Sequence, residues 1–265
     1  VENFFAGLYS HADIEADPTS AGRQMGGHFT THSLDENGEW KNLLKQKNSS
    51  SDISCTAGQM PRLLGLAQAS KVYRALPNAA AEGFSDHGNE VAWGTIGNAS
   101  TSEGHFFETL NAAGVMKVPM VMSVWDDEYG ISVPKEYHTT KESISEVMKG
   151  FVRDDKHAGI ELMVVNGWDY PALYEAYQKA ATIAREQHVP VLVHVRELTQ
   201  PQGHSTSGSH ERYKSAERLE WEKEFDCISK MREWILASGY ATEEELATIE
   251  QQAKKRVKDG RKKAW

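Results

Sequence analysis

The chain has 265 residues, of which 39% are hydrophobic, 25% are charged and 21 are glycine. This length is enough for one well-buried core with or without a small extension, and the composition is that of an ordinary globular protein. Both features exclude a disulfide-stabilised mini-protein and a wholly disordered chain. The longest apolar stretch, residues 118–125, is far shorter than the roughly 20 residues that cross a bilayer, so no membrane association is expected.

Charge and cysteine content restrict the partners and the compartment. The net charge is −9 although Lys and Arg cluster in residues 254–263, and this acidity argues against a general nucleic-acid-binding protein. The two cysteines, Cys55 and Cys227, form neither a CxxC metal clip nor a disulfide framework, which predicts a reducing, cytoplasmic location. The chain has no signal peptide and begins with Val1, so we expect it to be a fragment.

Apolar and helical patterns alternate along the chain. Uninterrupted runs rich in β-branched residues predict four strands covered on both faces, at 90–96, 118–125, 160–166 and 190–196. Helical periodicity predicts four helices, at 59–74, 102–114, 141–151 and 171–187. This alternation predicts an α/β fold, a doubly wound and mainly parallel sheet with helices on both faces.

The other segments predict loops and a helical C-terminal extension. Residues 35–52 and 78–88 are rich in Asn, Ser, Gly and charge, and we interpret the first as a mobile surface loop. Beyond a Gly-, Ser- and His-rich segment at 200–214, helices are expected at 215–238 and 242–258, the second with a capping box of Thr242 and Glu245. The basic cluster then falls in its last turns, where cations complement the helix dipole, and a polyanion site is the alternative.

The turn after the first predicted strand is a candidate phosphate site. Ligands of open parallel sheets bind beyond the carboxyl ends of the strands. Residues 97–104 are small there, so a ligand can approach the backbone, and Ser100 and Glu103 are suited to cap the next helix. Free amides and the helix dipole would make a phosphate cradle, and an ordinary turn that binds nothing is the alternative.

Three consecutive acids, Asp126, Asp127 and Glu128, follow the second predicted strand and precede Tyr129. Because Asn98 lies one strand, helix and strand unit earlier, Asn98 and Asp127 are expected to meet at the same sheet edge. Amide, carboxylate, backbone carbonyl and phosphate oxygens would together suit an octahedral Mg²⁺ ion. A solvated acidic loop is the alternative.

Histidines supply the remaining candidates. His204, after the fourth predicted strand, could donate a proton or orient an anion, and an ordinary surface histidine is the alternative. His28 and His32 are four residues apart but lack a strong third ligand for zinc. The GxSxG, Walker A, GxGxxG and HExxH motifs are absent from the sequence, which removes support for common hydrolases and nucleotide triphosphatases.

With these residues identified, the chain resembles the alpha subunit, or alpha half, of the thiamin diphosphate-dependent 2-oxo acid dehydrogenases, nearest to the branched-chain 2-oxoisovalerate enzyme. The matching segments are 22–25 with His28, 54–61, 97–104, 110–113, 129–134, 166–169 and 203–207. The resemblance implies a thiamin diphosphate-binding domain over 1–214, lacking its N-terminal part, and a helical extension over 215–265.

The resemblance also implies a cofactor site for thiamin diphosphate and Mg²⁺. Asn98 stands at the family's acid position and Asp127 at its amide position, so the two ligand types have exchanged places. We expect magnesium to be retained, with the Tyr129 carbonyl as a further ligand. The other residues implied at the cofactor are Ser54, Thr56, Gly97, Ala99, Ser100, Trp125, Ile131 and His204. Of these, His204 matches a histidine that contacts the diphosphate and assists acyl transfer to lipoamide.

Several positions depart from the family pattern. Trp125 replaces a polar residue of the branched-chain enzymes, and Gly58 removes a hydroxyl that some relatives use to hold potassium. Ser205 matches a serine that is phosphorylated in mitochondrial relatives. Residues that flank it in those relatives are replaced here by Gln200 and Gly208, which argues against control by a kinase.

The implied activity is decarboxylation of a branched-chain 2-oxo acid and transfer of the acyl group to a lipoyl-bearing acyltransferase component, in a heterotetramer with a beta subunit. No counterpart is found for the family's N-terminal Tyr-Arg pair, or for the glutamate that a beta subunit or fused beta half supplies. We therefore expect the chain to be catalytically incomplete alone. Pyruvate or acetoin dehydrogenase is one alternative, and a non-catalytic subunit with a decayed cofactor site is the other.

Overall fold

The computed structural model describes residues 1–265 except 25–27, 29, 78–81 and 205–208. Its internal contacts divide the chain into two compact units. The first comprises Val1–Trp40, Lys47–Ile53 and Arg232–Trp265, and the second comprises Lys41–Gln46 and Ser54–Met231. The expected division at residue 214 stays a prediction.

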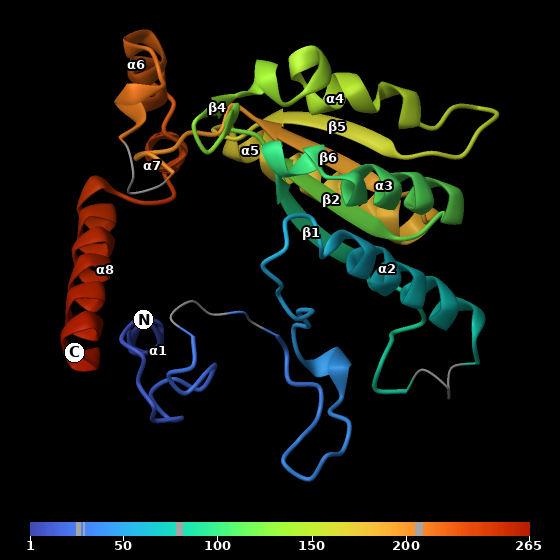
Figure 1. The fold of residues 1–265 in the computed structure, drawn as a ribbon, viewed down its shortest axis with the longest axis horizontal. Coiled ribbons are helices and arrows are strands. Elements are labelled where there is room, and N and C mark those ends of the chain that lie inside the picture. The colour runs from blue at the N-terminus through green and yellow to red at the C-terminus, as the bar shows by residue number, and fades with distance from the viewer. Residues whose placement is uncertain (25–27, 29, 78–81, 205–208) are drawn as a thin grey trace. The chain divides into compact units, whose positions relative to one another are not determined.

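The second unit is built on a four-stranded parallel sheet in the order β1-β2-β6-β5 (Figure 1). The strands are β1 (Ala92–Gly97), β2 (Met120–Trp125), β5 (Glu161–Asn166) and β6 (Val191–Arg196). All four strands lie where the apolar runs predicted them. Every residue of β2 and β6 except the last is buried, because these central strands are covered on both faces. The expected α/β fold with a parallel sheet is confirmed.

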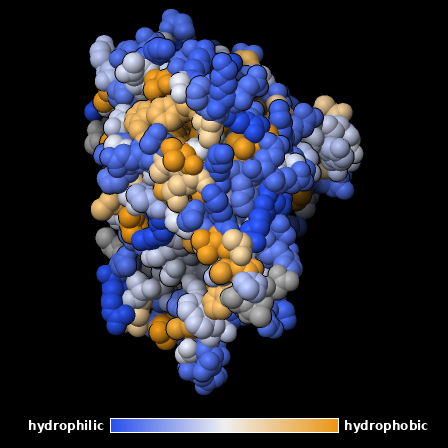
Figure 2. Space-filling model, turned by 90° about the vertical axis from the view of Figure 1, so that its right-hand side faces the viewer, coloured by the Kyte–Doolittle hydropathy of each residue, from blue (hydrophilic) through white to orange (hydrophobic). Residues whose placement is uncertain are grey.

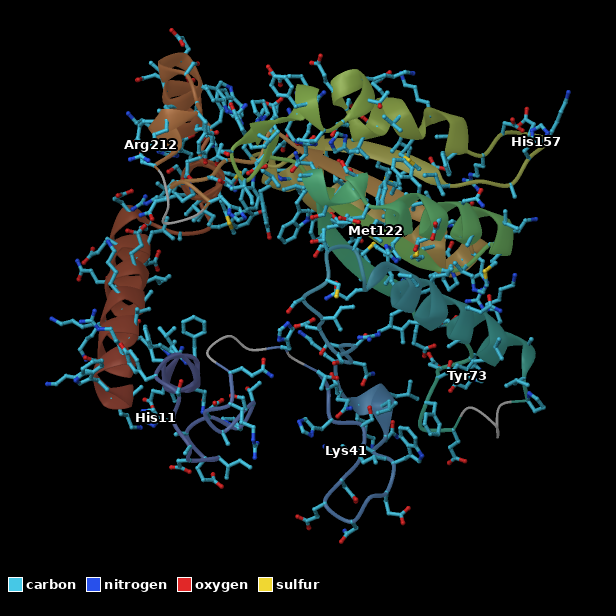
Figure 3. The ribbon with its side chains drawn as sticks, viewed as in Figure 1. His11, Lys41, Tyr73, Met122, His157 and Arg212 are labelled. Atoms are coloured by element: carbon cyan, nitrogen blue, oxygen red, sulfur yellow. The ribbon has the colours of Figure 1, made fainter. Side chains whose placement is uncertain are left out.

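Helices cover the two faces of this sheet. α2 (Met60–Ala75), α3 (Gly104–Met116) and α4 (Ile144–Val147) lie on one face, where α2 and α3 pack side by side (Figure 1). α5 (Tyr170–Thr182), extended by a π turn over Ile183–Gln187, covers the other face. Figure 3 labels Met122 of β2, which is fully buried in the hydrophobic core between the sheet and the helices α2, α3 and α4. Each such side chain contributes about 1.5–3 kcal/mol on transfer from water.

One predicted helix, at 141–151, is shorter than expected. Only Ile144–Val147 is α-helical, and the chain continues as a 3-10 turn, η6 (Met148–Phe151). Lys141 has a φ of 57° and Glu142 a φ of 56°, a left-handed backbone that no α-helix can contain. These two residues instead belong to a separate turn, η5 (Thr140–Glu142).

The single helix expected at 215–238 is wrong, because the structure has two. α6 (Ala216–Glu224) is followed by its C-cap residue Phe225, whose ring stacks on Trp221, and α7 (Cys227–Ala237) starts after Asp226. The Asp226 carboxylate accepts a hydrogen bond from the Ser229 amide at 2.8 Å. Such a carboxylate satisfies a free amide at a helix start, so it favours a new helix over continuation of the old one.

The first unit contains α1 (Glu2–Leu8), the end of α7 and α8 (Glu243–Ala264). The expected capping box of Thr242 and Glu245 is present at the start of α8, which runs six residues beyond the expected end at 258. α1 packs on α8, and the ring of Tyr9 meets that of Trp265 edge-on at 5.2 Å. Among the helices that the structure describes, none combines the length and apolar character needed to span a membrane.

Short elements complete the described structure. They are η1 (Leu43–Lys45), η3 (Ala99–Ser102), β3 (Tyr129–Gly130), β4 (Val133–Pro134), η4 (Lys135–Tyr137) and η8 (His210–Arg212). β3 and β4 form a small antiparallel pair directly after the acidic turn. The face of the molecule drawn in Figure 2 is mostly hydrophilic with separate hydrophobic patches, a pattern that is ordinary for a protein surface.

Candidate functional site

The two turns singled out in the sequence start side by side at the carboxyl edge of the sheet. Gly97, the last residue of β1, pairs in register with Trp125, the last residue of β2. The next amide, that of Asn98, donates to the Trp125 carbonyl at 3.0 Å. The structure therefore brings the turn after β1 and the turn after β2 to one place, as the strand, helix and strand spacing predicts.

Asn98 has a fixed backbone and an unsatisfied side chain. Its carbonyl accepts from the Thr101 hydroxyl at 2.5 Å and from the Thr101 amide at 3.1 Å. The residue is only 4% exposed, and its side-chain Nδ2 finds no hydrogen-bond partner among the residues that the structure describes. Because an unpaired buried amide costs free energy, this group is a donor suited to a ligand oxygen.

The two turns also touch through Ala99 and Gly130. A Cβ atom added to Gly130 would lie 2.6 Å from the Cβ of Ala99 and 3.7 Å from Nε2 of His138. Only glycine fits this approach between η3 and β3. The contact keeps the residues after Asn98 and those after Asp127 close together.

Asp127 is a half-buried carboxylate at the centre of the acidic turn. Its Oδ1 accepts from the Tyr129 amide at 3.2 Å. Burial raises the pKa of Asp127, and the Tyr129 hydrogen bond and the charge of Lys214 offset this only in part. A cation bound beside Asp127 would relieve this unfavourable ionisation.

Two residues of the turn have left-handed backbones. Glu128 has a φ of 71° and Ile131 a φ of 59°. This region is unfavourable for residues with a Cβ and persists only when surrounding contacts enforce it. The turn that contains Asp127 and Tyr129 is therefore held by its neighbours rather than by its own backbone preference.

Asp126, beside Asp127, points into the protein. It is 5% exposed, and its Oδ2 accepts from Nε2 of His194, a buried residue of β6, at 2.9 Å. Its Oδ1 accepts from the Glu128 amide at 2.8 Å. Burial opposes ionisation, but the hydrogen bonds from His194 and the Glu128 amide are stronger and lower the pKa of Asp126.

A charged cluster formed by Lys214, just before α6, and by two residues of α6 lies around Tyr129. The buried ammonium of Lys214 donates to both carboxylate oxygens of Glu222, at 2.7 and 3.0 Å, and lies 4.9 Å from the centre of the Tyr129 ring. Arg218 pairs with Glu222 at 2.8 Å and with Glu128, and also donates to the Asp127 carbonyl at 3.3 Å. The expected C-terminal extension thus contributes, through α6, to the surroundings of the acidic turn.

Four residues of this region were not predicted from the sequence, namely His194, Lys214, Arg218 and Glu222. One local signal was present, because Arg218 and Glu222 are four residues apart in a helical pattern, which is the spacing of a helix ion pair. His194 inside an otherwise apolar strand was a second signal. Neither signal indicates a partner in the acidic turn, because these partners are distant in the sequence.

Other predicted residues lie in the turns before α2 and α3. Ser54 and Thr56 are exposed in the turn before α2, and the next residue, Ala57, belongs to the same buried core as Ile96 of β1. Ser100 is half-buried in η3. The capping expectation for Ser100 and Glu103 is wrong, because α3 begins at Gly104 with no side-chain hydrogen bond at Glu103. A 3-10 turn occupies 99–102 instead, and it satisfies the Glu103 amide with a backbone carbonyl.

Trp125, Ile131 and His204 are also exposed. Trp125 is 53% exposed, and its indole Nε1 donates to the Ser123 hydroxyl at 3.0 Å. Ile131 is 58% exposed. His204 is exposed on the segment after β6, and Ser205, the position of a phosphorylated serine in relatives, lies outside the described residues.

Histidine and cysteine give no second site within the described ranges. His28 lies 3.2 Å from the Gln24 amide oxygen. No group of three or more His, Cys, Asp and Glu side chains suited to a metal occurs in the part of the chain that the structure describes. Cys55 and Cys227 are free thiols, as expected.

Comparison with known proteins identifies the family. The family model described as "Dehydrogenase E1 component" matches residues 14–265. The chain belongs to the dehydrogenase E1 component family. The match covers nearly the whole chain, and it confirms the resemblance found in the sequence.

Individual relatives of the E1 family are alpha subunits. The chain is 29% identical to the pyruvate dehydrogenase E1 component subunit alpha of Rickettsia bellii over 171 residues, 64% of this chain and 50% of that protein. It is 28% identical to the 2-oxoisovalerate dehydrogenase subunit alpha of Bacillus subtilis over 231 residues, 86% of this chain and 59% of that protein. A mitochondrial 2-oxoisovalerate dehydrogenase subunit alpha of Arabidopsis thaliana is 30% identical over 187 residues, 69% of this chain and 38% of that protein. The chain thus spans about half the length of these curated relatives.

Proposed function

We propose that this chain supplies the diphosphate- and metal-binding side of a thiamin diphosphate-dependent 2-oxo acid dehydrogenase active site. The observation that carries the proposal is the meeting of two turns, one with the unpartnered Asn98 amide and one with the Asp127 carboxyl, at adjacent strand ends. Membership of the E1 family supports this cofactor. A glutamate from a beta subunit or fused beta half would complete the site.

The donor set fits a diphosphate held through a divalent cation. Asp127 offers a carboxylate whose ionisation a cation would favour, and Asn98 offers an amide with both a donor and an acceptor. The Tyr129 carbonyl is the proposed third protein ligand. Since a diphosphate is strongly anionic, placing it against a carboxylate requires a divalent cation together with amide donors.

In this proposal the chain's own residues bind and orient the cofactor. Thiamin diphosphate, when bound, supplies the electron sink for decarboxylation of a 2-oxo acid. Amides at Ala99 and Ser100 would donate to the diphosphate, with Gly97 allowing close approach. Ser54, Thr56, Trp125 and Ile131 would line the cofactor, and His204 would contact the diphosphate and assist acyl transfer to a lipoyl-bearing acyltransferase component.

Calorimetric titration of thiamin diphosphate with Mg²⁺ into the chain joined to its beta partner tests the proposal. We expect the double variant Asn98→Ala with Asp127→Ala to raise the cofactor Kd by about tenfold or more, at least as much as loss of an outer-shell partner. The matched control removes an exposed amide and an exposed carboxylate elsewhere, Asn37→Ala with Asp155→Ala. Equal affinities for the double variant and the control would reject Asn98 and Asp127 as ligands, and no binding by the unmodified protein would favour a decayed cofactor site.

The substrate that we propose is a branched-chain 2-oxo acid. Pyruvate is the rival, since alpha subunits named for either substrate match this chain at similar identity. Decarboxylation assays on the assembled enzyme should give a higher kcat/KM for 2-oxoisovalerate than for pyruvate. The opposite order would assign the chain to the pyruvate or acetoin enzymes. The cytoplasmic location and the heterotetramer remain part of the proposal.

A further inference from the structure

Three buried side chains, those of Asp126, His194 and Ser145, form a series of hydrogen bonds next to the acidic turn. His194 is 2% exposed on β6, between the buried residues Val193 and Val195. Its Nε2 lies 2.9 Å from the Asp126 carboxylate, and its Nδ1 lies 3.1 Å from the hydroxyl of Ser145 on α4. An ionised carboxylate only accepts, so Nε2 carries a proton and donates to Asp126, while Nδ1 forms a hydrogen bond with the Ser145 hydroxyl.

Asp126 is tied to β6 and to its own turn by further bonds. Its amide donates to the Val195 carbonyl at 2.8 Å, and its carbonyl accepts from the Leu198 amide at 3.0 Å. Its second carboxylate oxygen accepts from the Glu128 amide. Asp126 therefore links β6 to Glu128, where the backbone is left-handed.

We propose that His194 and Asp126 are positioning residues that hold the turn so that Asp127 and the Tyr129 carbonyl face the cation site. This inference rests on the proposed function for the role of Asp127 and Tyr129. It adds a pair that acts through the turn and touches neither cofactor nor metal. The family resemblance assigned no role to either residue.

Stability alone does not account for this pair. Replacing a buried ion pair by apolar side chains of similar volume is often neutral or stabilising, so a retained pair is weak support for a purely stabilising role. Here the pair satisfies the Glu128 amide and connects the turn to two neighbouring elements, β6 and α4. Outer-shell hydrogen bonds of this kind orient metal ligands in other proteins.

The test separates position from stability with two variants. The double variant Asp126→Leu with His194→Leu removes the hydrogen bonds of the pair and fills the same space with apolar side chains. Asp126→Asn keeps an oxygen for the Glu128 amide and an amide that can donate to His194 Nε2, so it is the conservative rescue. Val193→Ala is the matched control, because Val193 is buried beside His194 on the opposite sheet face.

Two readouts are measured on the full chain with its beta partner. Mn²⁺ binding in the presence of thiamin diphosphate should weaken by about tenfold or more in the Leu/Leu variant, and recover in Asp126→Asn to within about threefold of the unmodified protein. Amide hydrogen exchange at Glu128 and Tyr129, measured without cofactor, should be roughly tenfold faster in the Leu/Leu variant. Val193→Ala should lower the thermal midpoint without either change.

The outcomes distinguish the two proposals. Unchanged exchange at Glu128 and Tyr129 in a folded Leu/Leu variant would overturn the positioning role, whatever the cofactor does. Loss of Mn²⁺ affinity in Val193→Ala of the same size as in the Leu/Leu variant would also overturn it. If the unmodified protein binds no Mn²⁺ with thiamin diphosphate, the proposed function fails, and the exchange measurement still decides whether the pair holds the turn.

Discussion

Two aspartate–histidine pairs in the second unit have nearly the same distance between nitrogen and oxygen but very different surroundings. Asp126 and His194 are 2.9 Å apart, with side chains 7% and 2% exposed. Asp154 and His157 are 3.0 Å apart, with side chains 61% and 74% exposed, and Figure 3 shows His157 on the projecting loop before β5. The distances alone would predict equal effects of the two pairs on the free energy of unfolding. Burial makes these effects different, because water and salt screen the exposed pair and cannot reach the buried one.

The largest expected effect comes from removing the histidine of the buried pair. His194→Leu leaves the Asp126 carboxylate buried without its partner, and we expect a loss of about 3–5 kcal/mol in the free energy of unfolding. Chemical denaturation measures it. His157→Leu is the control, and its loss in the free energy of unfolding should be far smaller than that of His194→Leu. Equal losses in both variants would show that burial does not separate the pairs.

An intermediate effect is expected at a second buried ion pair, Lys214 with Glu222. Lys214→Met removes one cation, but Arg218 still pairs with Glu222 at 2.8 Å. We therefore expect a loss of about 1–3 kcal/mol, smaller than for His194→Leu. The double variant Lys214→Met with Arg218→Met should lose more free energy of unfolding than the two single variants combined, because Glu222 then has neither cation. Strict additivity of the two substitutions would contradict a shared role at Glu222.

The smallest effect concerns acid titration of the exposed pair. The hydrogen bond from His157, followed by those from the amides of Lys156 and His157, lowers the pKa of Asp154 to about 2. A depressed carboxyl pKa contributes stability above the unfolded value of 3.8, and this contribution is lost as the pH falls from there through about 2. In His157→Ala, NMR titration of the Asp154 carboxyl should show a higher pKa that stays below 3.8, because the amide bonds remain. An unchanged pKa would show that the imidazole has no part in the shift.

Local patterns in the sequence predict most of the second unit. All four strands and the starts of α2, α3 and α5 follow from apolar runs and helical periodicity, because β2 and β6 are continuously apolar and the helices have long regular patterns. The errors arise where a few residues override the pattern. Lys141 and Glu142 take a left-handed backbone before α4, and Asp226 begins a new helix where periodicity suggested a continuous one.

In the candidate site, too, some features follow from local sequence patterns and others do not. The placement of Asn98 and Asp127 on neighbouring turns follows from the length of one strand, helix and strand unit. The partner of Asp126 does not, since His194 is 68 residues away in the sequence. The cation–π contact of Lys214 with Tyr129 likewise joins two residues that are 85 positions apart in the sequence.

By itself the sequence determined the alternation of strands and helices, the parallel sheet and the meeting of two polar turns at one edge, because side-chain periodicity and crossover length are local properties. Only the tertiary structure decided that Asp126 points inward to His194 while Asp127 accepts from the Tyr129 amide. Consecutive acids look equivalent in a sequence. They become different when β6 is inserted beside β2, buries one carboxyl group against an imidazole and leaves the next in the turn at the sheet edge.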